Sequence, residues 1–260
     1  EKNYQNFLDA KHMPTCRAIV EGANIFFTEK ARDELQKLGI IMIKDSSANK
    51  TGVICSSYEI IASLVLESSE FLAIKEKYVE QVIVILRGKA DAEAKLLIHE
   101  FERLGGAKTF VELSYEISKE INAVTDSILN YLTLEKEKKL GTDICRKIIM
   151  RHCPPILVEK YGDRLVERLP ETHKIAIISS FIASYIVYRE GLNWMPIQKP
   201  EECYKKALAY MQQDSITEKL VEDLNKSDVK DKETIRSILI RSAARDLTEF
   251  HFDDPLQPKK

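Results

Sequence analysis

The chain has 260 residues, and its 39 Lys and Arg against 41 Asp and Glu give a formal net charge of −2 at pH 7. This balance argues against a dedicated DNA- or RNA-binding protein, which would carry a basic surface, so we expect no nucleic-acid partner. Hydrophobic residues make up 44% of the chain, enough for a real core, and the low content of 9 Gly and 8 Pro favours long helices over an all-β fold.

The first predicted elements alternate between strand and helix. Two short apolar runs, residues 18–20 and 40–43, are each followed by a polar loop, as expected for strands buried in a parallel sheet. A helix is predicted between them over residues 28–39, and another from about residue 52 to residue 66. This order of elements is typical of a doubly wound α/β domain.

The helix between the two strands carries clear start and stop signals. Thr28 is a good N-cap, and Gly39 stands at the stop position. The spacing of Ala31, Leu35 and Leu38 predicts that all three share the buried face.

After residue 67 the apolar spacing changes to the period of an α-helix. One long helix is predicted to have a single apolar face of Phe71, Ile74, Tyr78, Val82 and Ile85. The next has a seam spaced by threes and fours, formed by Phe110, Leu113, Ile117, Ile121, Val124, Ile128 and Tyr131. Further helices are predicted at 143–152, 156–169, 171–188, 201–212, 216–225 and 232–250. Residues 135–139 have the composition of a solvated helix end or linker, and residues 253–260 that of a frayed tail.

The cysteines and the longest apolar stretch bear on the compartment. Five widely scattered cysteines do not resemble a disulfide scaffold, so we expect a reducing compartment. Cys145, His152 and Cys153 could share a helix face, but a structural zinc site needs four ligands, so no metal is expected.

Residues 175–188 are shorter than the roughly 20 residues of a membrane span, which predicts a core helix and no membrane partner. The chain does not begin with Met, and we expect it to be a piece of a longer protein.

Polar residues follow each of the two predicted strands. Gly22 and Asn24 come after the first strand, and Asn49 and Ser56 come after the second. In an open parallel sheet ligands bind outside the carboxyl ends of the strands, so these residues lie where a ligand would be met. Gly22 would allow a close approach, and Ser56, near a helix start, would favour a carboxylate. The alternative is that both asparagines are turn residues and that Ser56 only starts a helix.

The same residues carry a resemblance to a known family. Glu21-Gly22-Ala23-Asn24 and the run from Asn49 to Glu59 resemble the patterns E-G-A-N and N-A-G-G-V-x-x-S-Y-F-E of the glutamate/leucine/phenylalanine/valine dehydrogenase superfamily. Residues 20–26, 43–50 and 169–192 are most similar to the branch of large NAD-specific glutamate dehydrogenases. The sequence departs from the superfamily pattern at Lys50 and Thr51, where Ala and Gly are usual, and at Ser57-Tyr58, where Tyr-Phe is usual.

The resemblance implies roles for three residues. Asn24 corresponds to an asparagine that contacts the cofactor NAD near the nicotinamide ribose, and Asn49 to one that lies between NAD and the amino-acid substrate. Ser56 corresponds to the serine that binds the γ-carboxylate of glutamate. Relatives that act on leucine, phenylalanine or valine usually carry an apolar residue there, so glutamate is the expected substrate.

The resemblance also defines what the 260 residues lack. Arg103-Leu104-Gly105-Gly106 follows a helical pattern, so it is no phosphate-binding G-x-G-x-x-G turn. The catalytic Lys and Asp of the superfamily lie in an upstream domain, so no catalytic residue is expected here. We therefore expect this chain alone to be inactive.

The resemblance implies a mostly α fold with two domains. Residues 1–67 would be the C-terminal part of a Rossmann-type dinucleotide-binding domain with two short parallel strands, and residues 68–260 a helical C-terminal region. The full-length enzyme would be a cytoplasmic homo-oligomer, or a mitochondrial one in a eukaryote. The rival hypothesis is a helical interaction or regulatory module without catalysis, because most of the chain is amphipathic helix.

Overall fold

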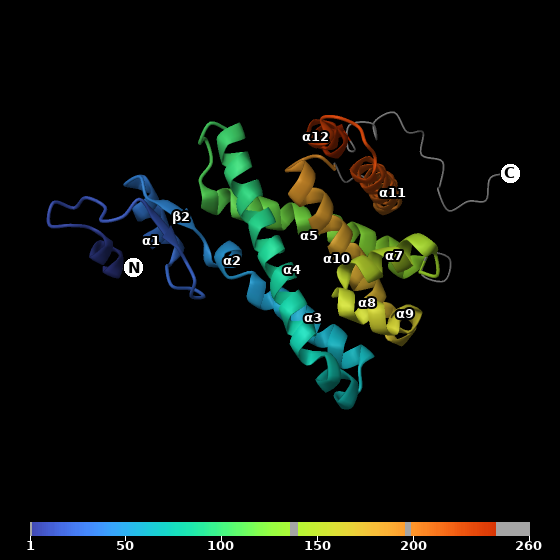
Figure 1. Cartoon of the computed structure of the whole chain (residues 1–260). Helices are drawn as coiled ribbons and strands as arrows, with labels where there is room; N and C mark the ends of the chain where they lie inside the picture. Colours follow the sequence, from blue (N-terminus) through green and yellow to red (C-terminus); the bar gives the residue numbers. More distant parts are fainter. Residues whose placement is uncertain (1, 136–139, 196–198, 243–260) are drawn as a thin grey trace. The chain divides into compact units, whose positions relative to one another are not determined.

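The computed structural model describes residues 2–135, 140–195 and 199–242. The chain divides into two compact units, whose helices and strands are labelled in Figure 1. The first unit combines Glu1–Glu120 with Cys153–Leu169, and the second combines Ile121–His152 with the chain from Pro170 onward. The described part is mostly α-helical with two short parallel strands, which confirms the predicted fold class of a Rossmann-type remnant followed by helices.

The first unit contains the two strands. After the 3-10 helix η1 (Lys2–Phe7), strand β1 (Ala18–Val20) pairs in parallel with β2 (Ile41–Ile43), and helix α1 (Glu29–Lys37) connects them. The pairing places Ile19 opposite Met42, and the backbone N–H of Glu21 extends the ladder to the carbonyl of Ile43 at 3.0 Å. Parallel pairing brings the carboxyl ends of both strands to the same edge.

Helix α1 begins and ends where its sequence predicts. The Thr28 hydroxyl accepts a hydrogen bond from the Ala31 N–H at 3.3 Å and caps the first turn. Gly39 has φ +87°, a conformation that few other residues adopt, and it turns the chain toward β2. Ala31 and Leu35 are buried as predicted, but Leu38 is 42% exposed because it caps the helix C-terminus.

Among the described residues, the apolar core of the sheet lies on one of its two faces. Phe27, Ala31, Leu35, Ile40 and Met42 form the core of this region, with Ile19 packed against it. On the strands, Val20 is 62% exposed and Ile41 is 41% exposed. The prediction that both strands are buried is therefore wrong for the second face, since α1 packs on one face of the pair alone.

Helices α2 (Asp45–Ala48), α3 (Thr51–Val65) and α4 (Ser68–Arg103) follow the strands. Glu67 and Glu70 form a capping box at the start of α4, where the Glu70 carboxylate accepts from the Glu67 N–H at 2.9 Å. Helix α4 packs against α3 and α2 and buries Ile74, Tyr78 and Val82, as its apolar spacing predicts.

Two short helices also belong to the first unit. Helix α8 (Pro155–Tyr161) packs on α4, and α9 (Asp163–Arg168) packs on α3. The sequence predicts a single helix over 156–169, but Gly162 lies between α8 and α9 with φ +47° and interrupts it. Glycine adopts this backbone conformation without steric cost, so the break occurs at the one residue that tolerates it.

The second unit contains α7 (Asp143–His152), α10 (Glu171–Glu190), α11 (Pro200–Lys226) and α12 (Lys232–Ser242). Helix α10 packs against α7 and α11, and α11 packs against α12. In α10 the residues Ile178, Ile182 and Ala183 are 0% exposed, which confirms the predicted core helix. Within the described ranges, no helix combines the length and the apolar character that crossing a membrane requires.

Helix α11 replaces two predicted helices. Residues 213–215 were predicted to separate helices 201–212 and 216–225, but α11 runs through them without a break. Asp214 in this stretch is 3% exposed and accepts hydrogen bonds from Arg151 at 2.9 Å, from Tyr185 at 2.7 Å and from Arg189. These partners satisfy the buried carboxylate, so a polar residue can lie in the middle of a packed helix.

Helix α5 (Phe110–Leu134) carries the predicted apolar seam. Leu113, Ile117, Val124, Ile128 and Leu132 are each 0% exposed. Ile121 and Tyr131 are only half-buried, so the last turns bury Leu132 in place of Tyr131. Residues 136–139 of the predicted linker, residues 243–250 of the predicted last helix and the tail 253–260 lie outside the described residues.

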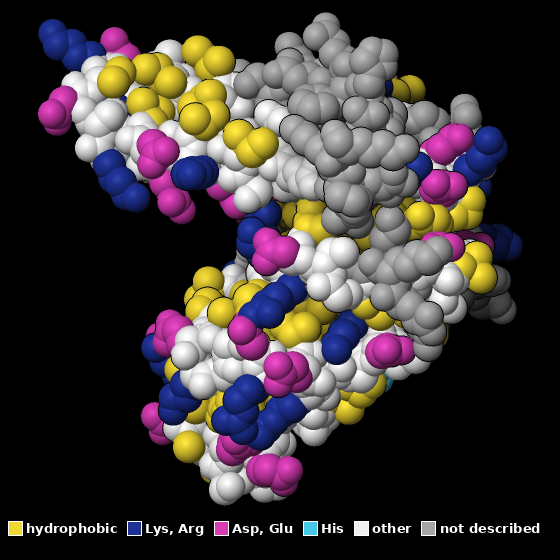
Figure 2. Space-filling view, turned by 90° about the vertical axis from the view of Figure 1, so that its right-hand side faces the viewer, with side chains coloured by type: hydrophobic (Ala, Val, Ile, Leu, Met, Phe, Trp, Pro, Cys, Tyr) yellow, Lys and Arg dark blue, Asp and Glu magenta, His cyan; other side chains and the backbone are white. Residues whose placement is uncertain are grey.

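Charged side chains are mixed by sign on the surface. On the face that Figure 2 presents, Lys and Arg side chains alternate with Asp and Glu, and apolar side chains lie between them. This mixture agrees with the net charge of −2.

Ile117 and Ile121 allow a matched test of the seam, because they are the same residue type one turn apart on one helix. Ile117→Ala should lower the free energy of unfolding by about 2–5 kcal/mol, since it removes a fully buried side chain. Ile121→Ala should lower the free energy of unfolding clearly less, because Ile121 is only half-buried. Urea denaturation of the 260-residue chain measures both, and an equal cost for the two variants would contradict the assigned face.

Candidate functional site

The structure brings Asn24 and Asn49 into contact at the carboxyl ends of the two strands. Asn24 lies in the loop after β1, and Asn49 lies at the end of α2, which follows β2. The side-chain amide of Asn49 donates to Oδ1 of Asn24 at 2.5 Å and to the carbonyl of Gly22 at 3.4 Å. The sequence placed both residues at this edge of the sheet, and the structure adds the direct hydrogen bond.

After this contact, one oxygen acceptor and one nitrogen donor of the two side-chain amides are left for a ligand. Nδ2 of Asn49 donates both of its hydrogens within the site, so Oδ1 of Asn49 and Nδ2 of Asn24 remain. Neither atom has a hydrogen-bond partner among the residues that the structure describes. Asn24 is exposed and Asn49 is half-buried, so the pair presents donors and an acceptor side by side. This set is complementary to a carboxamide or to neighbouring hydroxyls.

A buried ion pair fixes the ends of the strands. Arg32 of α1 donates from Nε to Glu21 Oε1 at 2.7 Å and from Nη2 to Glu21 Oε2 at 2.8 Å. Arg32 also lies 3.7 Å from Asp45 Oδ1, and Glu21, Arg32 and Asp45 are 2%, 4% and 9% exposed. A two-pronged bond of this kind fixes geometry as well as charge, and the bond to Glu21 raises the pKa of Arg32.

Asp45 connects the loop after β1 to the start of α2. Its carboxylate accepts hydrogen bonds from the backbone N–H of Ile25 at 2.8 Å and of Ser46 at 2.8 Å. Ile25 has φ +54°, which is rare for a β-branched residue, and the bond from its N–H stabilises this turn beside Asn24. The Ile25 N–H, followed by the Ser46 N–H and Arg32, holds the pKa of Asp45 below its ordinary value.

A second buried carboxylate contacts the segment that carries Asn49. Glu93 of α4 accepts from the Ser47 hydroxyl at 2.8 Å and from the Lys50 ammonium at 2.7 Å, and it is 3% exposed. The Ser47 hydroxyl also lies 2.6 Å from that of Ser114 on α5. Sequence patterns alone did not identify Arg32, Asp45 and Glu93 as residues of the site. For Arg32 a signal existed, since it is a charged residue beside Ala31 on a buried helix face.

Ser56 differs from its predicted setting. It is the sixth residue of α3, in the second turn, while the free N–H groups of a helix belong to its first four residues. Its hydroxyl is exposed and donates to the carbonyl of Gly52 at 3.4 Å, within its own helix. Ser56 therefore does not lie at the helix N-terminus, and the prediction of an anion-favouring helix start at this residue is wrong. Among the described residues, no hydrogen bond joins Ser56 to either asparagine.

The space at Gly22 is open. A Cβ built there would meet no atom within 4 Å, so packing within the described chain does not require a glycine. The opening is consistent with a ligand that approaches the backbone closely.

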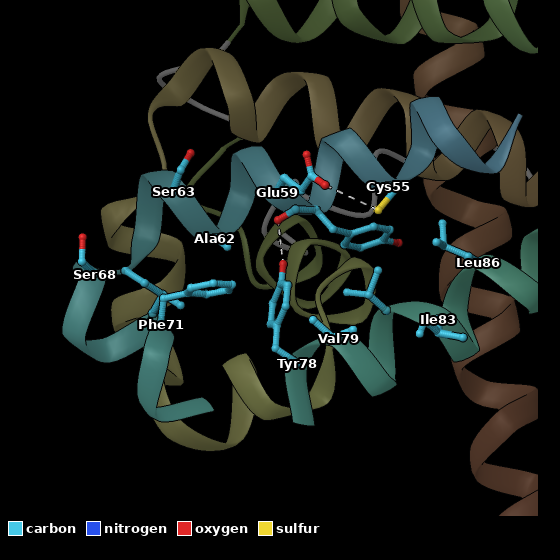
Figure 3. A pocket seen from close by; sticks show the side chains of 13 residues that line it. Cys55, Glu59, Ala62, Ser63, Ser68, Phe71, Tyr78, Val79, Ile83 and Leu86 are labelled. Carbon is cyan, nitrogen blue, oxygen red and sulfur yellow. Dashed lines mark hydrogen bonds between the residues drawn. The ribbon is translucent and has the colours of Figure 1, made fainter. Parts of the chain in front are cut away.

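An apolar hollow of about 550 Å³ lies between α3 and α4 in the same unit. Figure 3 shows it between α3, which carries Cys55 and Glu59, and α4, which carries Phe71 and Ile83. The Tyr78 hydroxyl donates to the carbonyl of Tyr58 at 2.6 Å inside it. Within the described ranges, no group of three or more His, Cys, Asp or Glu residues could hold a metal ion.

Comparisons with known proteins agree on one family. Residues 3–96 match the family model described as Glutamate/Leucine/Phenylalanine/Valine dehydrogenase. The chain is 38% identical over 189 residues to "Glutamate dehydrogenase 2" of Dictyostelium discoideum, which covers 67% of this chain and 17% of that protein. It is 33% identical over 208 residues to "NAD-specific glutamate dehydrogenase" of Saccharomyces cerevisiae, covering 74% of this chain and 18% of that protein.

A third relative has a similar extent. The chain is 32% identical over 213 residues to "Probable NAD-specific glutamate dehydrogenase" of Schizosaccharomyces pombe, covering 75% of this chain and 18% of that protein. The chain thus spans less than a fifth of the length of these curated relatives. No solved structure matches the chain.

The role of Asp45 predicts a pH dependence. Because the folded-state pKa of Asp45 is below its ordinary value of 3.8, its contribution to stability is complete at neutral pH and is lost as the pH falls through that range. Asp45→Asn should therefore destabilise the chain more at pH 7 than at pH 3. Urea denaturation at both pH values measures this. Asp33→Asn, at an exposed position of α1, is the control and should change little at pH 7. An equal cost for Asp45→Asn at both pH values would contradict the assignment.

Proposed function

The chain belongs to the glutamate/leucine/phenylalanine/valine dehydrogenase family, and on that premise we propose that it is part of an NAD-dependent glutamate dehydrogenase. The full-length enzyme oxidises L-glutamate with NAD and water to 2-oxoglutarate, ammonia and NADH. The observation that supports this most is the paired amides of Asn24 and Asn49 at the carboxyl ends of parallel strands, where such sheets bind ligands.

The paired amides suit the nicotinamide end of NAD. The Nδ2 donors of Asn24 and the Oδ1 acceptor of Asn49 match the carbonyl and amino groups of a carboxamide, or the hydroxyls of a ribose. NAD, when bound, supplies the acceptor for the hydride. Hydride transfer requires the α-carbon of glutamate and the nicotinamide ring to be held in contact. The two asparagines would contribute by orienting these groups, and they do not act as acid or base.

Ser56 is proposed to bind the γ-carboxylate of the substrate. Its hydroxyl is exposed, and its hydrogen bond to Gly52 is long at 3.4 Å, so it can turn to a charged acceptor at little cost. A hydrogen bond to a carboxylate is stronger than one between neutral groups. This contact would favour glutamate over amino acids with apolar side chains.

The remaining parts of the proposal concern assembly and location. Val20, Ile25 and Phe26 are 62%, 83% and 63% exposed beside the candidate site, and apolar side chains of this size are usually covered in a complete protein. We propose that the rest of the full-length chain covers them, that the enzyme forms a homo-oligomer, and that it functions in a reducing compartment, the cytoplasm or, in a eukaryote, the mitochondrion. Residues 1–67 would belong to the cofactor domain and residues 68–260 to a helical C-terminal region.

The alternative function is a helical interaction or regulatory module without catalysis. It is favoured by the second unit, whose described elements are all helices, with the buried carboxylate of Asp214 paired with Arg151 and Arg189. Glutamate-dependent reduction of NAD by the full-length protein separates the two hypotheses, since a module without catalysis would show none.

Ser56→Ala in the full-length protein tests the substrate assignment. The variant should lower kcat/KM for glutamate by about ten- to a hundred-fold, leave KM for NAD nearly unchanged and narrow the preference for glutamate over norvaline. Ser63→Ala is the matched control, because Ser63 is also exposed on α3 and also donates to a backbone carbonyl of that helix. An unchanged ratio of glutamate to norvaline in Ser56→Ala would restrict Ser56 to a structural role.

The 260-residue chain by itself should show no dehydrogenase activity and at best weak binding of NAD. The reason is that its sequence contains no phosphate-binding glycine-rich turn, and the resemblance puts the catalytic Lys in an upstream domain. Calorimetric titration of the chain with NAD measures this. Binding in the micromolar range would contradict the prediction.

A further inference from the structure

Glu93 is a buried carboxylate with both oxygens directed at one short segment. Oε1 accepts from the Ser47 hydroxyl at 2.8 Å, and Oε2 accepts from the Lys50 ammonium at 2.7 Å. These residues stand two positions before and one position after Asn49. Glu93 lies 43 positions after Lys50 on another helix, so this contact depends on the fold and not on neighbourhood in the sequence.

A buried carboxylate requires a compensating partner. Glu93 is 3% exposed, and removing such a group from water is unfavourable unless it is paired and hydrogen-bonded. Its charged partner is Lys50, the position at which the sequence departs from the superfamily pattern, where Ala is usual. The departure therefore has a structural counterpart on α4.

The segment between Ser47 and Lys50 has little stability of its own. Helix α2 contains only four residues, too few to be stable in isolation. The backbone N–H of Asn49 donates to Asp45 at 2.9 Å, and the carbonyl of Asn49 accepts from Gly52 at 3.1 Å. These local bonds set the turn, but they do not fix the turn relative to the loop of Asn24. The bonds to Glu93 attach it to a helix of 36 residues.

We propose that Glu93 is a positioning residue that holds the Ser47–Lys50 segment so that the amide of Asn49 meets Asn24 and the ligand. The proposal rests on the proposed role of Asn49 at the cofactor and substrate. Loss of the contact of Glu93 with Ser47 or with Lys50 lets the Ser47–Lys50 segment shift. A displacement of about 1 Å in an oriented site can lower the rate by about a hundred-fold.

Kinetics of the full-length protein distinguish positioning from general stability. Glu93→Gln keeps the shape of the side chain but removes the negative charge that the Lys50 ammonium contacts at 2.7 Å. It should raise KM for glutamate or NAD several-fold and lower kcat/KM by about ten- to a hundred-fold. A merely structural residue would reduce the amount of folded enzyme, which scales the apparent kcat and leaves both KM values unchanged.

Glu100→Gln is the matched control. Glu100 is 2% exposed on the same helix, but it pairs with Arg103 of that helix at 2.6 Å. Both variants should lower the melting temperature, and only Glu93→Gln should change the KM values. The proposal is overturned if the two variants have the same kinetic effect, or if the KM values of Glu93→Gln equal those of the parent.

A double variant tests whether Glu93 acts through Lys50. Lys50→Ala installs the usual residue of the superfamily and removes the ammonium that donates to Glu93. The double variant should lose less activity than the product of the two single losses. Losses that simply multiply would overturn the proposal.

Two further measurements keep the test decisive. If Glu93→Gln does not fold, Ser47→Ala replaces it and removes the hydroxyl bond to Oε1 together with the contact to the Ser114 hydroxyl. Ser46→Ala is its control, because the Ser46 hydroxyl also contacts Ser114 but not Glu93, and the KM values should rise only in Ser47→Ala. Asn49→Ala in the same assay tests the proposed function itself. If Asn49→Ala impairs the kinetics and Glu93→Gln leaves them normal, the positioning role of Glu93 alone is refuted. A parent protein without glutamate-dependent NAD reduction refutes both proposals, because Asn49 would then have no ligand to meet.

Discussion

The guanidinium of Arg32 lies between two carboxylates, and the candidate site depends on this contact. It forms two hydrogen bonds with Glu21, directly after β1, and lies 3.7 Å from Asp45, shortly after β2. Breaking a buried pair by removing one partner typically costs about 3–5 kcal/mol, because a charge is left uncompensated. The ends of the strands are therefore fixed relative to α1, and the loops that follow begin from fixed points.

The two loops are then held by two separate carboxylates. Asp45 accepts the N–H of Ile25 and fixes the loop of Asn24, while Glu93 binds Ser47 and Lys50 around Asn49. The asparagines themselves are exposed or half-buried, so their ligand-facing groups stay accessible while their backbones are anchored to buried charge. A site of this kind is organised before a ligand binds, which reduces the free energy spent on ordering it.

Local signals in the sequence predicted the elements well. The Thr28 cap, the φ of Gly39 and the apolar runs of the strands act within a few residues, and each appears in the structure as expected. One prediction failed because a local signal at Gly162 was missed, and another because distant contacts decide. The polar stretch 213–215 reads as a helix break, but partners on other helices satisfy Asp214 and α11 continues.

In the candidate site too, local position in the sequence was predictable and contacts between distant residues were not. The position of Asn24 and Asn49 after successive strands was enough to predict that they lie at one edge of the sheet, because parallel strands end together. Their mutual hydrogen bond and the support from Glu93 join residues 25 and 43 positions apart. The start of α3 at Thr51 is within one residue of the predicted start, but Ser56 is the sixth residue of the helix and lies beyond its free N–H groups.

A crystal structure of the full-length protein with NADH and 2-oxoglutarate would test the central claim most directly, namely that the Asn24–Asn49 pair forms the nicotinamide side of a glutamate dehydrogenase site. We predict that Nδ2 of Asn24 and Oδ1 of Asn49 lie within hydrogen-bond distance of the nicotinamide carboxamide, the adjoining ribose or the substrate. A nicotinamide ring bound away from both asparagines, with their mutual hydrogen bond unchanged and facing solvent, would contradict the account.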